Sequence, residues 1–251
     1  MAVAITQTAD PAGVAADGSF NTTYSTLSIG TATDDRVVVV VIGKEVATRV
    51  PGTVTLGGLT MVQASGTTFG SMGAWLYYLS YPTGTTATVV IAWGGAVAST
   101  ENHIAVYTIT DGGFPPKLSG SNSSTDMDAS SPLTTGSVTI ATNGGVLAIA
   151  VGATDTVVKT WANITVDLEE DAGGFRFTTA KRITSGTVTI TCTGTTNLED
   201  GAMAYAIFEQ AALPPVPTKP VIQTIARAGP RSAVPVVAAM NDLFLPPFRP
   251  Q

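Results

Sequence analysis

Short runs of apolar and Thr-rich sequence recur along the chain as far as residue 210, and turn residues separate them. The breaks carry pairs such as Gly57-Gly58 and Asn143-Gly144, which favour tight turns. Thr accounts for 40 of the 251 residues, and β-branched side chains lose rotamer freedom in helices but pack well on a pleated sheet. Repeated short strands with Gly-rich turns predict an all-β sandwich or barrel.

Twelve strands are predicted, in two sets of six. The first set covers residues 21–29, 36–43, 53–63, 72–80, 86–93 and 103–110. The second set covers residues 135–141, 145–152, 163–170, 175–181, 187–193 and 203–209. No window before residue 211 has the 3.6-residue periodicity of an amphipathic helix.

The two sets of strands resemble each other. The similar pairs of segments are 25–43 with 133–152, 82–93 with 183–193, and 103–110 with 202–209. The offset of about 100–110 residues is too long for a solenoid and suits a duplicated half-sandwich. Two interpretations stay open: tandem domains at 20–110 and 133–210 joined by the polar, Ser-rich connection 111–134, or one sandwich with an internal pseudo-repeat. We favour the single sandwich.

Two of the predicted strands are apolar without interruption. They read RVVVVVIG at 36–43 and GVLAIAVG at 145–152. A strand reads in this way when both of its faces are covered. We therefore expect them to be central strands, buried by the opposite sheet on one face and by a neighbouring loop or subunit on the other.

The sequence changes character at residue 211. Nine of the 15 prolines lie in residues 211–251, and LPPVPTKP at 213–220 predicts a stiff, extended spacer. The segment also carries many large apolar side chains, which a solvated linker would not need. Because it is too rich in proline to build its own core, we expect an extended arm whose side chains are buried on a partner.

The predicted partner-binding residues of the arm are Val221, Ile222, Ile225, Val236, Val237, Leu243, Phe244, Leu245, Phe248 and Arg249. Packing of the arm back onto its own body is the alternative.

Charge separates the same two regions. The net charge of −6 divides into −9 for residues 1–210 and +3 for residues 211–251. The body should repel nucleic-acid phosphates, and four cations in the arm are too sparse for a nucleic-acid tail, but a mildly basic arm can dock on an acidic protein surface. Residues 1–13 lack the basic and apolar regions of a signal peptide, and the sequence has no long apolar span, so we expect no signal peptide, no membrane partner and folding in a reducing cytoplasm.

Residues that could carry chemistry are few. The single cysteine, Cys192, excludes an intramolecular disulfide and a Cys-based zinc site, and the single histidine, His103, is interpreted as a polar strand end. The acidic run at 167–171 has oxygens suited to Ca²⁺, as do Asp126 and Asp128, but a solvated edge strand and a polar loop are the preferred interpretations.

Paired carboxylates for hydrolysis would have to come from strand ends. The candidates are Glu101, Asp111, Asp155 and Glu199, and only the fold could bring two of them together. We predict no enzyme activity, no catalytic residue, no cofactor and no metal site.

Aromatic residues gather in AWLYYLSY, which contains Trp75, Tyr77, Tyr78 and Tyr81. Core or subunit-interface packing is the preferred interpretation, and stacking on a glycan is the alternative. Exposure of Trp75, Tyr77 or Trp161 beside a cleft would favour glycan binding, whereas burial would favour a structural role.

Four segments of the body resemble β-sandwich virion proteins of tailed bacteriophages. They are DDRVVVVVIGKE (34–45), TVTLGGLTMV (53–62), WLYYLSYPTGTTATVVIAW (75–93) and HIAVYTITDGG (103–113). The resemblance covers most of residues 20–210 and none of the arm. It implies a jelly-roll-like module on the exterior of a capsid or tail, with no enzymatic residues.

The sequence thus predicts an all-β, jelly-roll-like antiparallel β-sandwich of about twelve strands in residues 1–210 and an extended arm in residues 211–251. The predicted function is that of a virion structural protein, a capsid decoration, head-fibre or neck component assembled in the host cytoplasm. It would dock on other virion proteins through the arm and form homo-oligomers. The alternative is a receptor- or glycan-binding tail module.

Overall fold

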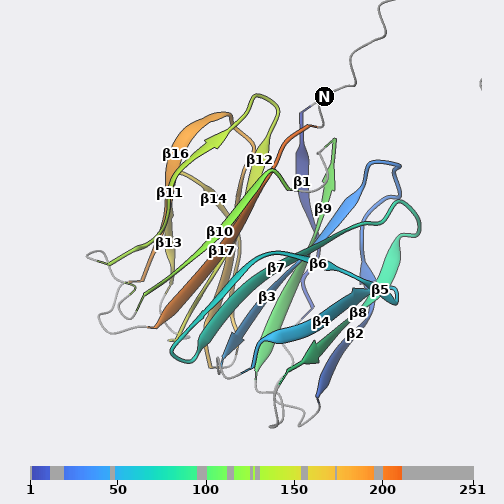
Figure 1. The fold of residues 1–251 in the computed structure, drawn as a ribbon, viewed down its shortest axis with the longest axis horizontal. Coiled ribbons are helices and arrows are strands. Elements are labelled where there is room, and N and C mark those ends of the chain that lie inside the picture. The colour runs from blue at the N-terminus through green and yellow to red at the C-terminus, as the bar shows by residue number, and fades with distance from the viewer. Residues whose placement is uncertain are drawn as a thin grey trace, which may run out of the picture. The chain divides into compact units, whose positions relative to one another are not determined.

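Seventeen strands, paired throughout as antiparallel neighbours, form the part of the chain that the computed structural model describes (Figure 1). The described residues are 2–11, 20–45, 49–94, 101–111, 116–124, 127, 131–153, 158–172, 174–194 and 200–210. The chain divides into two units, Met1–Ala212 and Leu213–Gln251, and all described residues belong to the first.

The first half of this unit contains two sheets. One is a five-stranded sheet in the order β1-β9-β3-β7-β6, and the other is a four-stranded sheet in the order β2-β8-β4-β5. The strands are β1 (Ala4–Ala9), β2 (Asn21–Ser28), β3 (Val37–Glu45), β4 (Pro51–Leu56), β5 (Leu59–Thr60), β6 (Val62–Phe69), β7 (Met72–Ser80), β8 (Thr86–Trp93) and β9 (Asn102–Thr110).

The second half repeats this arrangement. Its sheets have the orders β10-β17-β12-β15-β14 and β11-β16-β13. The strands are β10 (Leu118–Ser124), β11 (Leu133–Ile140), β12 (Gly145–Gly152), β13 (Thr160–Ala162), β14 (Thr165–Asp171), β15 (Arg176–Arg182), β16 (Gly186–Thr193) and β17 (Gly201–Phe208). The predicted internal repeat is therefore confirmed at the level of strand order.

Each half has the connectivity of a jelly roll. In the first half, β5 and β6 can be counted as one strand, the fifth of eight, that takes part in both sheets. One sheet then contains the first, eighth, third and sixth strands (β1, β9, β3 and β7). The other contains the second, seventh, fourth and fifth (β2, β8, β4 and β5), which is the order of a jelly roll. The second half differs only at its fifth strand, β14, which pairs with β15 alone. The predicted all-β, jelly-roll-like fold is confirmed, although the strands form two jelly rolls with four sheets and not the single two-sheet sandwich that we favoured.

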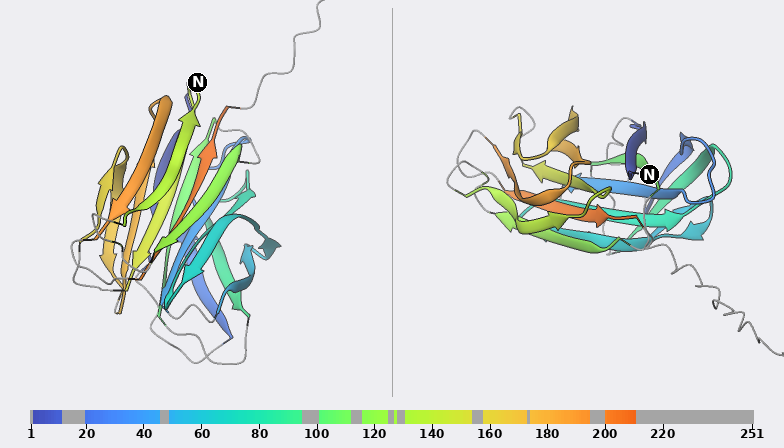
Figure 2. Two further views of the ribbon diagram at one scale, coloured as in Figure 1. Left: turned by 60° about the vertical axis from the view of Figure 1, so that its left-hand side comes forward. Right: turned by 90° about the horizontal axis from the view of Figure 1, so that it is seen from above.

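The four sheets form four layers, with the two five-stranded sheets packed face to face in the middle. In Figure 1 the strands β11, β13 and β16 lie on one side of these central sheets, and β2, β4 and β8 lie on the other. The two halves also remain on opposite sides in both views of Figure 2. This layering produces three cores, one inside each half and one between the halves.

Strand β3 contributes to two of these cores at once. Val37, Val39 and Val41 face the core between the halves, and the alternating Val38 and Val40 face the core inside the first half. Strand β12 divides its side chains in the same way, and every residue of it is buried. The expectation that both strands are covered on both faces is confirmed, and the second cover is the sheet of the other half.

Small residues on the central sheets leave room for large side chains of the facing sheet. A Cβ atom added to Gly43 of β3 would overlap the ring of Phe177 and lie 2.7 Å from Cγ1 of Val151. On β17, alternate residues that face the same core are Ala202, Ala204 and Ala206. Any larger side chain at Gly43 would force the halves apart.

The strand count is higher than the predicted twelve, for identifiable reasons. Strands β7, β8 and β12 have the predicted bounds, but the segment predicted as one strand at 53–63 is divided at the Gly57-Gly58 turn. Strand β10 lies within the segment interpreted as a polar connection, where Ser and Gly give little strand preference. It forms because all seven of its residues pair with β17. Strand β1 was also missed.

The repeat extends to a matched irregularity in two edge strands. The pairing of β2 with β8 shifts register between Tyr24 and Leu27, and the pairing of β11 with β16 shifts between Thr134 and Ser137. In these bulges Thr26 has φ 55° and Gly136 has φ 69°. Glycine adopts a positive φ freely, whereas a β-branched residue such as Thr is strained there.

We therefore expect Thr26→Asn to stabilise the protein, by roughly 0.5–1 kcal/mol, because Asn tolerates the left-handed conformation better than Thr. Gly136→Thr should destabilise it by about 1–2 kcal/mol for the opposite reason. Urea denaturation followed by tryptophan fluorescence measures both changes. A loss of stability in Thr26→Asn would show that the bulge in β2 is not strained.

Candidate functional site

Polar residues replace apolar ones at one end of the first half. Lys44 of β3 and Asn102 of β9 form the last pair in the register of these two strands. Strand alternation directs both side chains into the interior of the first half, on the same side as Ile42 and Ile104. The side chains are nevertheless inaccessible, since Lys44 is 0% and Asn102 is 1% exposed.

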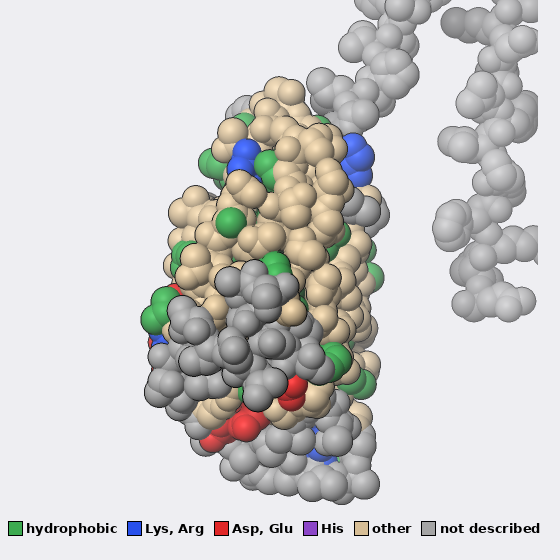
Figure 3. Space-filling view, turned by 90° about the vertical axis from the view of Figure 1, so that its left-hand side faces the viewer, with side chains coloured by type: hydrophobic (Ala, Val, Ile, Leu, Met, Phe, Trp, Pro, Cys, Tyr) green, Lys and Arg blue, Asp and Glu red, His purple; other side chains and the backbone are tan. Residues whose placement is uncertain are grey.

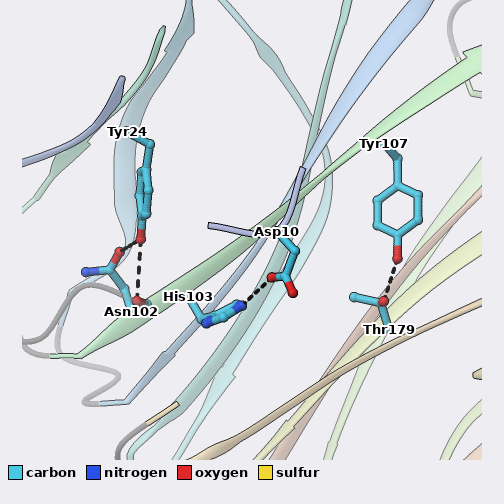
Figure 4. A network of polar contacts seen from close by, with 6 residues as sticks. All are labelled: Asp10, Tyr24, Asn102, His103, Tyr107 and Thr179. Atoms are coloured by element: carbon cyan, nitrogen blue, oxygen red, sulfur yellow. Dashed lines mark hydrogen bonds and ion pairs between the residues drawn. The ribbon is translucent and has the colours of Figure 1, made fainter. Parts of the chain in front are cut away.

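A network of hydrogen bonds surrounds this strand end. The Tyr24 hydroxyl donates to Oδ1 of Asn102 at 2.6 Å (Figure 4), and Nδ2 of Asn102 donates to Oγ1 of Thr22 at 3.4 Å. The Trp93 indole N–H donates to the same Thr22 oxygen at 2.9 Å, and its ring meets Trp75 edge to face with centroids 6.4 Å apart. These contacts hold the polar side chains in fixed positions.

Two cations are buried at the same end. The Nζ atom of Lys44 lies 3.8 Å from the centroid of the Trp93 ring, and the Cζ atom of Arg49 lies 5.5 Å from that of Phe20. Arg49 is only 3% exposed. Within the described part of the chain, neither Nζ of Lys44 nor Nη1 and Nη2 of Arg49 has a hydrogen-bond partner. Burial, reinforced by the charge of Arg49, lowers the pKa of Lys44 to about 8, so Lys44 is mostly protonated at neutral pH.

The second half closes the equivalent position with apolar atoms. The last pair in the register of β12 and β17 is Gly152 with Gly201. A Cβ atom added to Gly201 would lie 2.5 Å from Sδ of Met127, which is buried in the core of that half. The jelly-roll fold therefore does not require cations at this strand end.

His103 lies on the opposite face of β9, towards the second half. Its Nε2 atom is 2.8 Å from Oδ1 of Asp10, and its ring centroid is 4.5 Å from that of Phe177 (Figure 4). The histidine is at a strand end, as predicted, but its side chain is buried and paired with a carboxylate.

A hydrogen bond between two hydroxyl groups joins the two halves. The hydroxyl groups of Tyr107 and Thr179 are 2.5 Å apart in the core between the central sheets (Figure 4). Burial raises the pKa of the Tyr107 phenol well above its usual range, so the group stays protonated. This hydrogen bond satisfies two hydroxyl groups that burial would otherwise leave without water.

The acidic run forms the edge strand β14, as preferred from the sequence. Asp167 pairs with Lys181 at 2.8 Å, and Glu169 pairs with Arg176 at 3.1 Å. In the described ranges no three His, Cys, Asp or Glu side chains are grouped so that they could hold a metal ion. Asp126 and Asp128 lie outside the described residues.

The carboxylates of Glu101 and Glu45 lie close to the same glycine, Gly174, but only Glu101 was among the candidates for hydrolysis. Oxygens of Glu101 and Glu45 both lie next to the position of a Cβ atom added to Gly174. Of the other candidates, Asp111 has its backbone N–H donating to Asp35 at 2.5 Å. Asp155 and Glu199 lie outside the described residues.

The aromatic side chains pack inside the protein. Trp75 and Tyr77 are buried in the core of the first half, and Trp161 is buried in the core of the second. The Tyr77 hydroxyl donates to Oε1 of Gln63 at 2.9 Å, and the Trp161 indole N–H donates to Oγ1 of Thr178 at 3.0 Å. The packing interpretation of these rings is confirmed.

A shallow groove of about 500 Å³ lies elsewhere, beside β1 and the β14–β15 pair. Ile5, Ile164 and Ile183 line it together with Lys181 and Arg182. Both cations already have partners, since Lys181 pairs with Asp167 and Arg182 donates to the Asn163 carbonyl at 2.8 Å. The cations that line the groove are therefore paired, whereas Nζ of Lys44 and the Nη atoms of Arg49 have no partner among the described residues.

Comparison of the chain with protein-family models, with curated proteins and with solved structures finds no match. Within the described ranges no helix is long and apolar enough to cross a membrane. The ten predicted partner-binding residues of the arm lie outside the described residues. The buried cations Lys44 and Arg49 were not among the sequence-predicted sites.

The depressed pKa of Lys44 predicts how stability depends on pH. Between about pH 8 and 10.5 the native state binds fewer protons at this group than the unfolded state, so stability rises with pH in this window. Below pH 8 the buried charge is destabilising in full. We expect Lys44→Met to be more stable than wild type at pH 7, by roughly 1–2 kcal/mol after solvent screening, and the difference to vanish by about pH 10.5.

Urea denaturation between pH 7 and 10.5, in chloride buffers without phosphate or sulfate, measures this difference. Lys117→Met is the matched control, because Lys117 has a side chain 63% exposed and pairs with Glu209 at the surface. A stabilisation of Lys44→Met that does not change with pH would contradict the account.

Proposed function

We propose that this protein is a structural component of a tailed-bacteriophage virion, a capsid decoration, head-fibre or neck protein that docks on other virion proteins through residues 211–251. The proposal rests on the combination of two features in one chain. The β body has hydrophobic cores of its own, and it is followed by a proline-rich segment with many large apolar side chains. The resemblance of the body sequence to virion β-sandwich proteins agrees with this assignment.

The body supports the proposal through its construction. Two jelly rolls share a central core, and the members of all three cores among the described residues come from positions 3–208. The outer side of the second half, seen in Figure 3, is dominated by uncharged polar and backbone atoms with isolated charges. Neighbouring hydroxyl groups on this side bond to each other, as Thr139 and Thr187 do at 2.9 Å. Such a body is suited to a rigid, passive role.

The arm supports the proposal through its composition. Prolines at 214, 215, 217 and 220 make the start of the segment stiff, so it can reach across a neighbouring subunit. Beyond them, Phe244 and Phe248 can act as anchors, and VIQTIA at 221–226 can add a strand to an open sheet edge. The charge of +3 on the arm favours an acidic acceptor, such as a body of charge −9 in another copy.

The burial of the aromatic rings favours this role over that of a glycan-binding tail module. Sugar stacking needs an exposed ring, and Trp75, Tyr77 and Trp161 are 3%, 4% and 9% exposed.

Deletion of residues 213–251 tests the proposal. Tagged full-length and truncated proteins are expressed while the virions that carry this protein are produced, and the virions are purified on a density gradient. We expect the truncated protein to keep the cooperative unfolding of the body but to be lost from the virions, because it lacks its anchors.

Full-length protein with both Phe244→Ala and Phe248→Ala should be depleted from the virions as well, whereas Gln223→Ala serves as a control that leaves the apolar anchors intact. Incorporation of the truncated protein at the wild-type level would overturn the docking role of the arm. Absence of the full-length protein from purified virions would overturn the virion assignment itself.

A further inference from the structure

We propose that Lys44 and Arg49 form a binding site for a small oxyanion, a phosphate, sulfate or carboxylate group, at the strand end of the first jelly roll. This site does not depend on the virion assignment or on the arm. The geometry that points to it is a pair of buried cations whose Nζ and Nη atoms have no hydrogen-bond partner among the described residues.

The first step of the argument is the burial of both charges. Lys44 and Arg49 are each more than nine-tenths buried, and Nζ of Lys44 and both Nη atoms of Arg49 have no hydrogen-bond partner among the described residues. An unpaired cation in the protein interior is strongly unfavourable, and a second cation nearby adds repulsion. Both penalties fall when an anion binds between them.

The second step concerns the groups around the cations. Aromatic rings cover part of each charge, Trp93 at Lys44 and Phe20 at Arg49, but a ring face supplies much weaker stabilisation than an anion. The acids next in sequence do not supply one either. Alternation along β3 directs Glu45 away from Lys44, and its carboxylate lies beside Gly174 on the other side of the sheet.

The third step is the comparison with the second half. There the equivalent pair is Gly152 and Gly201, and Met127 packs against Gly201. The second half also buries a lysine, Lys159, before β13, but its charged group is not among those without a hydrogen-bond partner. Among the described residues, only the first half therefore holds buried cations whose charged nitrogen atoms are unpaired. A local feature that opposes stability in this way is characteristic of a binding site.

The residue types determine the class of ligand. The guanidinium of Arg presents a planar set of donors that matches two oxygens of a carboxylate, phosphate or sulfate, and the ammonium of Lys adds a point charge. The hydrogen-bonded Thr22 and Asn102 provide a polar wall on the same side. A divalent metal ion would be repelled, since the site holds two positive charges.

Isothermal titration calorimetry and thermal unfolding of the full-length protein test the proposal. Phosphate, sulfate and acetate are each compared with chloride at equal ionic strength. We expect at least one oxyanion to bind with a stoichiometry of one per chain and to raise the melting temperature. Lys44→Met and Arg49→Met should each weaken binding at least tenfold. Lys44→Arg, which keeps the charge, should retain most of it, and Lys117→Met should bind as wild type does.

The pattern among the anions separates two sources of the ligand. Binding of phosphate or sulfate indicates a free inorganic ion, whereas binding of acetate alone indicates a carboxylate supplied by another molecule. Binding that is equal in wild type, Lys44→Met and Arg49→Met, or no binding of any oxyanion to wild type, would overturn the proposal. If Lys44→Met fails to fold, the comparison of Arg49→Met and Lys44→Arg with wild type still shows whether binding depends on these two side chains.

Discussion

The face-to-face packing of the two five-stranded sheets is the contact on which the rest of the structure depends. It buries Val37, Val39 and Val41 of β3 against the sheet that contains β12, while the alternate residues of both strands pack inside their own jelly rolls. Neither half could expose this face to water, because burying a Val or Ile side chain contributes about 1.5–3 kcal/mol and the interface contains many of them. The two jelly rolls are therefore one folding unit with four layers, although their sequences repeat.

This packing also decides where the two halves can differ. The centres of β3 and β12 are enclosed on both faces, so only small or apolar residues fit there, as Gly43 opposite Phe177 illustrates. The strand ends have more freedom. One half places Lys44 at its end and the other places Gly152. The second half also buries a lysine, Lys159, but among the described residues only Lys44 and Arg49 are buried cations with charged nitrogen atoms that lack a hydrogen-bond partner. The repeated fold thus supplies stability through the shared core, and the strand end of the first half carries the anion site that we propose.

Much of the fold could be predicted from the sequence because the strands follow simple patterns. The bounds of β7, β8 and β12 and the repeat of strand order were recognisable from apolar runs and glycine turns. Strand β10 was not, because Leu118–Ser124 is rich in Ser and Gly and becomes a strand only by pairing with β17. Lys44 could have been placed inside by counting alternate residues from Val38, but the lack of a hydrogen-bond partner for its Nζ atom among the described residues is visible only in the folded structure.

Native-state hydrogen exchange tests the shared core most directly. The backbone amides of Val39 and Val41 in β3 and of Ile149 and Val151 in β12 report on the two halves separately, and the exchange is followed as urea is added below the unfolding transition. If the central packing makes the halves one unit, all four amides exchange with the same free energy and the same urea dependence as global unfolding. Exchange of the β12 amides through an opening of much lower free energy, while the β3 amides stay protected, would contradict this account.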